Sequence, residues 1–428
     1  MLTLVSNTGS RSCDGATRRD FLRVGSLGVA GLTLPNLIRA RASASESGQA
    51  IKNKSVIWLW LSGGPTHVET FDPKMTAPLE YRSITGEAKT PIPGVTIGGT
   101  FPQIAAVGDK MSFVRSFSHG NSSHGSATTW IMTGYNDRTG TKPALGSIVA
   151  RAQGTTNAHT GMPTYVKMGR IRSDGPGWLG TAYSAFDPAG QARKNLNAIV
   201  PAERFQSRRS LLNGLDTIRR DADRSGKMEG IDGFEQQAFE LILGNSQDAF
   251  DINKEDAKTR SRYGKGLGEN LLKARRLCEV GCAFVSLNYG GWDMHGGIVK
   301  GMKRSAGQMD QGVSALIEDL DQRGMLDDTL LVITGEFGRT PRINKKAGRD
   351  HWGRLCTLAL AGGGLQMGQV VGESSRKIEV PASTPIAPQD LMATIMHMYG
   401  MDYRIQFLNN GGRPTYMIED GKPIPELI

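Results

Sequence analysis

Short apolar segments with the character of buried strands alternate along this chain with longer helical patterns. The first, residues 55–61, reads Ser-Val-Ile-Trp-Leu-Trp-Leu and ends directly in Ser62-Gly63-Gly64-Pro65. A continuous β-branched and aromatic run of this length is typical of a strand that is buried on both faces. Comparable runs occupy 112–117, 163–168, 282–287, 329–334 and 355–361. Helical patterns lie at 144–152, 204–222, 231–250, 265–280, 309–320 and 388–399. This alternation predicts an α/β fold with a large, mainly parallel sheet that carries helices on both faces.

The first 44 residues predict an export signal rather than part of that fold. Residues 18–22 read Arg-Arg-Asp-Phe-Leu, a weakly apolar run follows at 24–38, and 41–44 read Arg-Ala-Ser-Ala, which resembles a cleavage site. The run is too short for a bilayer span of about 20 residues. Because paired arginines before an apolar run resemble a twin-arginine signal, we expect the twin-arginine export machinery as a partner. We expect cleavage near Ala44 and a mature chain that is periplasmic or secreted, without a stable membrane anchor.

The charge of the chain does not point to nucleic acid. The formal net charge is +10, but six arginines and two aspartates lie within residues 1–44, so 45 basic and 39 acidic residues remain, a net charge of +6. The basic pairs at 208–209 and 219–220 lie in a polar helical pattern without interleaved aromatic residues. A nucleic-acid-binding face normally shows a denser basic patch, so no nucleic-acid partner is expected.

Residues 45–428 are predicted to form one domain. No Pro- or Ser-rich linker divides this segment. The polar stretch 185–270 has few strand signals, so we expect a helical insertion or cap there. In open parallel sheets the functional site lies beyond the carboxyl ends of the strands, which directs attention to the loops that follow them.

Five of the seven histidines lie in four loops that follow predicted strands. The loops are 62–72, 118–126, 288–297 and 335–353, and the histidines are His67, His119, His124, His295 and His351. His, Asp and Glu side chains that converge at strand ends can bind a divalent metal. Asp293-x-His295 is the sharpest pair, since alternate residues of an extended segment project to one side. For any single histidine, a structural hydrogen bond to a backbone carbonyl is the alternative.

These loops, in this order, resemble a bacterial family of unknown function within the alkaline phosphatase/sulfatase superfamily. The resemblance covers about residues 52–428. Its motifs here are Leu61-Ser-Gly-Gly-Pro-Thr-His67, Phe71-Asp-Pro-Lys74, Thr133-Gly134, Gly291-Trp-Asp-Met-His295, Thr334-Gly-Glu-Phe-Gly-Arg-Thr-Pro341 and Asp350-His-Trp-Gly353. The resemblance implies an alkaline-phosphatase-like fold, a three-layer α/β/α sandwich. It also implies hydrolysis of phosphate or sulfate esters by a bound metal and a side-chain nucleophile.

Carried over residue by residue, the resemblance implies a metal site and a catalytic set. The expected ligands of a divalent metal, zinc, calcium or another ion, are Asp293, His295, Glu336 and His351. Counting back from the helix end at Thr133-Gly134 places His124 near the nucleophile position, with Ser126 as the first-choice hydroxyl. Arg339 is expected to steady the anion.

Two departures from the superfamily pattern keep a second function open. No Cys-x-Pro-x-Arg occurs, which excludes a formylglycine sulfatase, and Ser62-Gly63-Gly64 stands where the first strand usually ends in a metal-binding Asp. The expected function is therefore an exported metal-dependent hydrolase acting on an anionic sulfated or phosphorylated ester. The alternative is a non-catalytic periplasmic binding protein on the same fold, possibly for polyanionic glycans.

Overall fold

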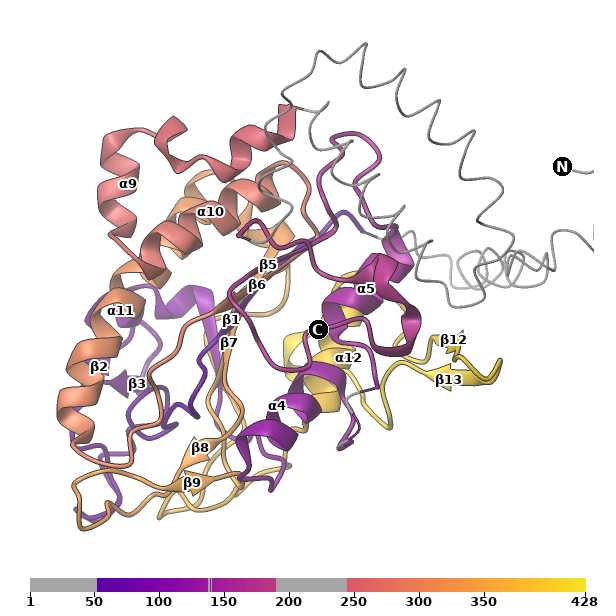
Figure 1. Ribbon diagram of the computed structural model, residues 1–428. Helices are drawn as coiled ribbons and strands as arrows, with labels where there is room; N and C mark the ends of the chain where they lie inside the picture. The colour runs from indigo at the N-terminus through magenta and orange to yellow at the C-terminus, as the bar shows by residue number, and fades with distance from the viewer. Residues whose placement is uncertain (1–51, 138, 140, 190–244) are drawn as a thin grey trace, which may run out of the picture. The chain divides into compact units, whose positions relative to one another are not determined.

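The computed structural model describes residues 52–137, 139, 141–189 and 245–428 (Figure 1). The described residues from Asn53 onward belong to one compact unit. The predicted signal, the predicted helix 204–222 and most of the predicted helix 231–250 lie outside the described residues. Residues 190–244 of the predicted cap also lie outside the described residues. The cap and the one-domain organisation therefore stay predictions.

A seven-stranded sheet with the order β11-β4-β10-β7-β1-β6-β5 forms the centre of this unit. β1 pairs in parallel with β6 and β7, β5 with β6, and β11 with β4, whereas β10 runs antiparallel to both of its neighbours. The strands are β1 (Ser55–Trp60), β4 (Met111–Val114), β5 (Tyr165–Met168), β6 (Phe284–Asn288), β7 (Thr329–Thr334), β10 (Leu358–Gly362) and β11 (Gln369–Val371). The predicted mainly parallel sheet is confirmed.

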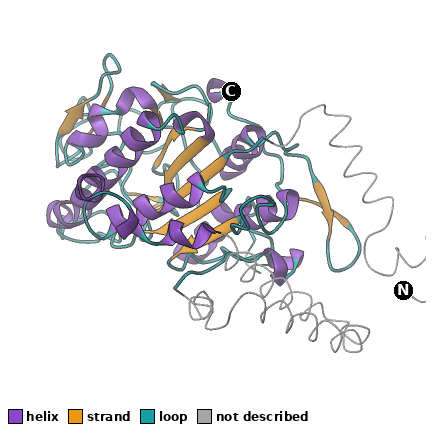
Figure 2. Ribbon diagram, turned by 90° about the horizontal axis from the view of Figure 1, so that it is seen from above, coloured by secondary structure: helices purple, strands orange, loops and turns teal. Residues whose placement is uncertain are grey.

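Helices cover both faces of the sheet, as Figures 1 and 2 show. Ile57 and Leu59 of β1 pack into a core with α3, α10 and α11, whereas Trp58 and Trp60 pack into a core with α4, α5 and α12. This alternation follows from the two-residue repeat of a strand. The helices are α3 (Pro102–Ala106), α4 (His124–Thr133), α5 (Leu145–Gln153), α9 (Ala257–Tyr263), α10 (Leu267–Glu279), α11 (Ile298–Gln322) and α12 (Pro388–Met398). The α/β/α layering expected from the sequence is therefore confirmed.

Smaller secondary-structure elements lie outside the seven-stranded sheet and its covering helices. Three two-stranded sheets are formed by β2 (Glu87–Lys89) with β3 (Thr96–Gly98), β8 (Gly338–Arg339) with β9 (His351–Trp352), and β12 (Gln406–Leu408) with β13 (Pro414–Tyr416). Short 3-10 helices are η1 (Gly108–Lys110), η2 (Gly177–Leu179), η3 (Thr181–Tyr183), η4 (Asn245–Phe250), η5 (Ile252–Lys254), η6 (Leu326–Asp328) and η7 (Pro425–Leu427). Among the described helices, none combines the length and the apolar composition that crossing a bilayer requires.

The prediction of a helix over 309–320 was too short. α11 begins at Ile298 and continues the same buried stripe through Met302, Ser305 and Met309. Its first half carries Gly301 and Gly307, which lower helix propensity and interrupt the apolar repeat in the sequence. Packing of the stripe against the sheet and α10 outweighs this local cost, because tertiary burial supplies most helix stability in proteins.

The β8–β9 ribbon determines where the last motif of the sequence lies. β8 follows β7 after a three-residue turn, and its Arg339 pairs with His351 of β9. The chain therefore folds back on itself over residues 340–350 and returns His351 to the carboxyl edge of the sheet. β1, β6 and β7 end at the same edge, since Trp60 is in register with both Asn288 and Thr334.

Candidate functional site

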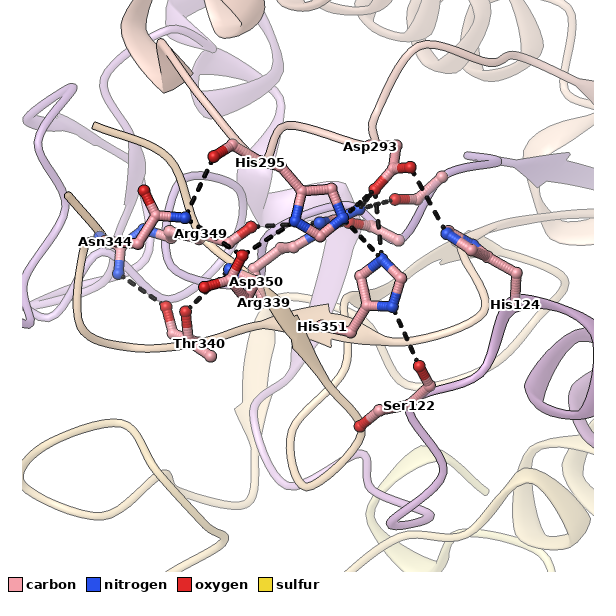
Figure 3. Close-up of polar contacts among 12 residues, drawn as sticks. Ser122, His124, Asp293, His295, Arg339, Thr340, Asn344, Arg349, Asp350 and His351 are labelled. Carbon is pink, nitrogen blue, oxygen red and sulfur yellow. Dashed lines mark hydrogen bonds and ion pairs between the residues drawn. The ribbon is translucent and has the colours of Figure 1, made fainter. Parts of the chain in front are cut away.

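Three imidazole rings and one carboxylate converge at the carboxyl edge of the sheet (Figure 3). Asp293 Oδ1 lies 3.0 Å from His295 Nε2 and 3.3 Å from His351 Nε2, and the two Nε2 atoms are 2.9 Å apart. His124 Nε2 lies 3.6 Å from the other oxygen of Asp293. His124, Asp293 and His351 each offer a ligand atom within 4.8 Å of the others. For comparison, two ligands of a tetrahedral zinc ion lie about 3.3 Å apart when each bond is about 2.0–2.1 Å.

The hydrogen bonds of the two central histidines leave their Nε2 lone pairs facing each other. His351 Nδ1 lies 3.1 Å from the carbonyl oxygen of Ser122, which can only accept, so Nδ1 carries the proton. His295 Nδ1 lies 2.9 Å from Asp350 Oδ1, and a carboxylate likewise accepts. Two Nε2 lone pairs and the Asp293 carboxylate then meet within about 3 Å, an arrangement that favours a cation among them. The donor set and its spacing therefore fit a divalent metal.

His124 is held in the same manner by Glu336. Its Nδ1 lies 2.6 Å from Glu336 Oε1, which also accepts from the backbone N–H of Gly63 at 2.9 Å. This hydrogen bond to the carboxylate raises the pKa of His124, and partial burial opposes the rise. Phe337 packs against His124 and His351 with ring centroids 4.8 and 4.6 Å apart, which fixes both rings. A histidine whose Nδ1 donates to a carboxylate and whose Nε2 faces the site is the usual arrangement of a metal ligand with its outer partner.

The charges around the site also match a divalent cation. With neutral histidines, three carboxylates and one guanidinium contact the cluster, a net charge of −2; they belong to Asp293, Glu336, Asp350 and Arg339. Burial alone would raise the pKa of Asp293, but its hydrogen bond to Arg339 and the charge of Arg339 lower that pKa overall. Burial and the charge of Arg339 lower the pKa of His351, which favours its neutral, ligating form.

Arg339 does not lie where it could steady a substrate anion. Its side chain is fully buried; Nε donates to the Gly64 carbonyl at 2.8 Å, Nη1 donates to the Arg349 carbonyl at 3.1 Å, and Nη2 donates to Asp293 and to the Gly63 carbonyl. The guanidinium thus holds Asp293 and the loop after β1 in place through these hydrogen bonds. Gly63 has a φ of +115°, and a Cβ there would lie 2.5 Å from the Asp293 nitrogen, so only glycine permits this close approach.

The hydroxyl of Ser126, the first-choice nucleophile, bonds to Asn121 rather than to a residue of the cluster. It exchanges hydrogen bonds with the Asn121 side chain, at 2.9 Å as acceptor and 3.2 Å as donor. One residue, Gly125, separates Ser126 from His124 on α4, so the two side chains leave the helix in very different directions. The neighbouring Ser122 hydroxyl accepts from the backbone N–H of Gly353 at 2.9 Å.

The other acidic and histidine side chains of the loops 62–72 and 118–126 make contacts within the scaffold. Glu69 is fully buried and pairs with Arg349 at 2.8 Å, and Asp72 bonds to Ser374 at 2.5 Å. His67 is buried and His119 is half-buried, and loss of hydration lowers the pKa of each to about 4. None of these side chains contacts the cluster in the described part of the chain.

The structure therefore brings Asp293, His295 and His351 together and adds His124, expected only near the nucleophile. It places Glu336 behind His124 rather than in the centre. Sequence reasoning missed Asp350, which orients His295, although its position beside His351 in the last motif was a signal. The Ser122 carbonyl carried no signal, because a backbone acceptor has no sequence signature.

Similar solved structures include the lipoteichoic acid synthase LtaP from Listeria monocytogenes (10% identity, 91% of this chain and 82% of that chain covered, TM-score 0.39). They also include the PsFucS1 sulfatase from Pseudoalteromonas sp. (12%, 85% and 70%, 0.37) and the phosphonate monoester hydrolase SpPMH from Silicibacter pomeroyi (12%, 82% and 74%, 0.30). No curated protein matches the chain. The model of the family described as "Protein of unknown function (DUF1501)" matches residues 53–428, and the chain belongs to that family.

Proposed function

We propose that this protein is a metal-dependent hydrolase of phosphate or sulfate esters. The observation that carries the proposal is the hydrogen bonding of His295 and His351: both Nδ1 atoms donate outward, so both Nε2 atoms face Asp293 with free lone pairs. Imidazole nitrogen with one carboxylate suits zinc and several other divalent ions. The motif resemblance to the alkaline phosphatase/sulfatase superfamily supports an anionic ester as the substrate.

Four side chains would hold the ion, and two carboxylates would orient them. The proposed ligands are His124, Asp293, His295 and His351, with Glu336 and Asp350 as positioning residues. When bound, a divalent ion would polarise a phosphoryl or sulfuryl oxygen and lower the pKa of water. The Ser126 hydroxyl is engaged by Asn121, so we propose water as the attacking group in its place.

Metal content and ester hydrolysis, measured on the same preparation, test this function. We expect the purified chain to retain a divalent metal and to hydrolyse para-nitrophenyl phosphate or sulfate, and chelation to remove both properties together. Ser126→Ala should change the rate by less than about threefold, because its partner is Asn121 alone.

Two outcomes would contradict parts of this proposal. Hydrolysis that survives complete metal removal would exclude the metal mechanism, and metal binding without any hydrolysis would favour a binding protein. A loss of about 100-fold or more in Ser126→Ala, with metal retained, would restore that serine as the nucleophile.

We further propose that the chain is exported by the twin-arginine machinery and is cleaved near Ala44. The order of paired arginines, apolar run and small residues supports this proposal. Changing Arg18 and Arg19 to lysine is expected to leave uncut precursor in the cytoplasm, detected by its larger mass in cell fractions. Normal processing of that double variant would exclude this route.

A further inference from the structure

An arginine outside the cluster lies against the helix turn that carries His124. Arg172 belongs to the turn after β5, and its guanidinium covers Gly125, the second residue of α4. Both Cζ and Nη1 of Arg172 lie 3.0 Å from the position that a Cβ on Gly125 would occupy. A side chain at position 125 would therefore crowd the guanidinium in its present position.

The turn that carries Arg172 is anchored to α4 and to the core. Ser173 Oγ lies 2.8 Å from Thr129 Oγ1, one helical turn after Gly125. Ile171 is buried, and its backbone N–H donates to Asp174 at 3.4 Å. Ser173 has a φ of +59°, a conformation that non-glycine residues adopt only where the surrounding contacts hold them.

Arg172 is an exposed cation that has no hydrogen bond or ion pair within the described residues. Asp174, the acidic residue of the same turn, faces Lys167 instead, with Nζ 3.7 Å from the carboxylate. Arg339, the arginine that the sequence suggested for anion binding, has its donors taken by backbone carbonyls and Asp293. Arg172 is thus a guanidinium on the first turn of α4, beside the residue next in the chain to His124, that retains its donors for a ligand.

We propose that Arg172 binds the phosphate or sulfate group of the substrate beside His124, and so determines specificity for anionic esters. This inference rests on the proposed function and deepens it. A planar guanidinium donates two parallel hydrogen bonds to an oxyanion. The same hydrogen bonds to a neutral ester are weaker, because the acceptor carries no charge. Gly125 acts with Arg172, since its missing side chain lets the guanidinium lie beside the start of α4.

Binding of inorganic phosphate and sulfate to the metal-loaded mature chain, measured by calorimetry, tests the inference. Arg172→Ala is expected to weaken phosphate binding by about 10- to 100-fold, the range for a charge-assisted hydrogen bond, with metal content unchanged. In hydrolysis the same variant should raise KM more than it lowers kcat. Arg172→Lys should recover only part of the loss, because an ammonium lacks the paired donors.

Two further variants separate this role from a general effect of charge or folding. Gly125→Ala suits a helix better than glycine but places a methyl group 3.0 Å from the guanidinium, which must shift, so it should also weaken phosphate binding. Arg170→Ala removes an exposed arginine two residues away and should leave phosphate binding within about threefold of the unmodified protein.

The outcomes distinguish this inference from the function on which it rests. Unchanged phosphate binding in Arg172→Ala, with metal bound, contradicts the role of Arg172 alone. An equal loss in Arg170→Ala contradicts it as well, because it shows a diffuse effect of charge. Failure of the unmodified chain to bind metal contradicts the proposed function and this inference together.

Discussion

Replacing His351 by alanine is expected to lower the metal affinity of this protein by more than about 100-fold and to remove its ester hydrolysis. Loss of even an outer partner of a metal ligand typically costs about 10- to 100-fold, and a direct ligand contributes more. His351 Nε2 also lies 2.9 Å from His295 Nε2 and 3.3 Å from Asp293, so its removal opens the centre of the cluster. Metal titration and hydrolysis rates measured on one preparation check this prediction.

Two matched variants serve as comparisons for the expected loss of metal affinity in His351→Ala. His159→Ala removes an exposed histidine in a turn remote from the cluster and should leave metal affinity unchanged. Glu336→Gln keeps an acceptor oxygen for His124 but removes the charge, so we expect an intermediate loss of about 10- to 100-fold. Equal metal affinity in His351→Ala and His159→Ala would eliminate the proposed site.

The second large effect concerns stability: Arg349→Met is expected to destabilise the fold by about 3–5 kcal/mol. Arg349 and Glu69 are both fully buried and pair at 2.8 Å, so removing the guanidinium leaves an uncompensated buried carboxylate. Although burial alone would raise the pKa of Glu69, Arg349 lowers it, which keeps this carboxylate charged. The urea-unfolding midpoint and the thermal midpoint of the variant measure the loss.

A double variant shows whether the buried charge is the cause. Glu69→Gln combined with Arg349→Met removes both charges and keeps one acceptor oxygen for Ser83 and Thr85, which donate to Glu69 in the protein. It should be more stable than Arg349→Met alone. Arg354→Met, an exposed change five residues along, should stay within about 0.5 kcal/mol of the unmodified protein. A double variant less stable than Arg349→Met would contradict the explanation.

The same pair links stability to the site. Arg349 precedes Asp350 and His351, and its backbone N–H donates to the Met294 carbonyl at 3.1 Å. Arg349 therefore connects the segment that carries His351 to the loop that carries Asp293 and His295. We expect Arg349→Met to weaken metal binding also, even at temperatures where the variant is folded.

Six of the seven strands of the sheet and the layer order could be read from the sequence because they depend on neighbouring residues, whereas the short edge strand β11 was missed. β1 is a continuous apolar run, and such a run is stable only when both faces of the strand are covered. The antiparallel direction of β10 could not be read in this way. Strand direction depends on how the chain crosses the sheet between β7 and β10, and the residues of β10 itself are compatible with either direction.

The sequence by itself determined which loops carry the chemistry: polar residues follow apolar strands, and the ends of parallel strands share an edge. Only the tertiary structure decided the role of each side chain there. Glu336 and Asp293 are both carboxylates in glycine-rich loops, yet one faces His124 Nδ1 and the other faces three Nε2 atoms. Which atom a side chain meets depends on contacts between segments far apart in the chain, such as the β8–β9 ribbon that returns His351. Local periodicity carries no information about such contacts, because it records only which face of an element is buried.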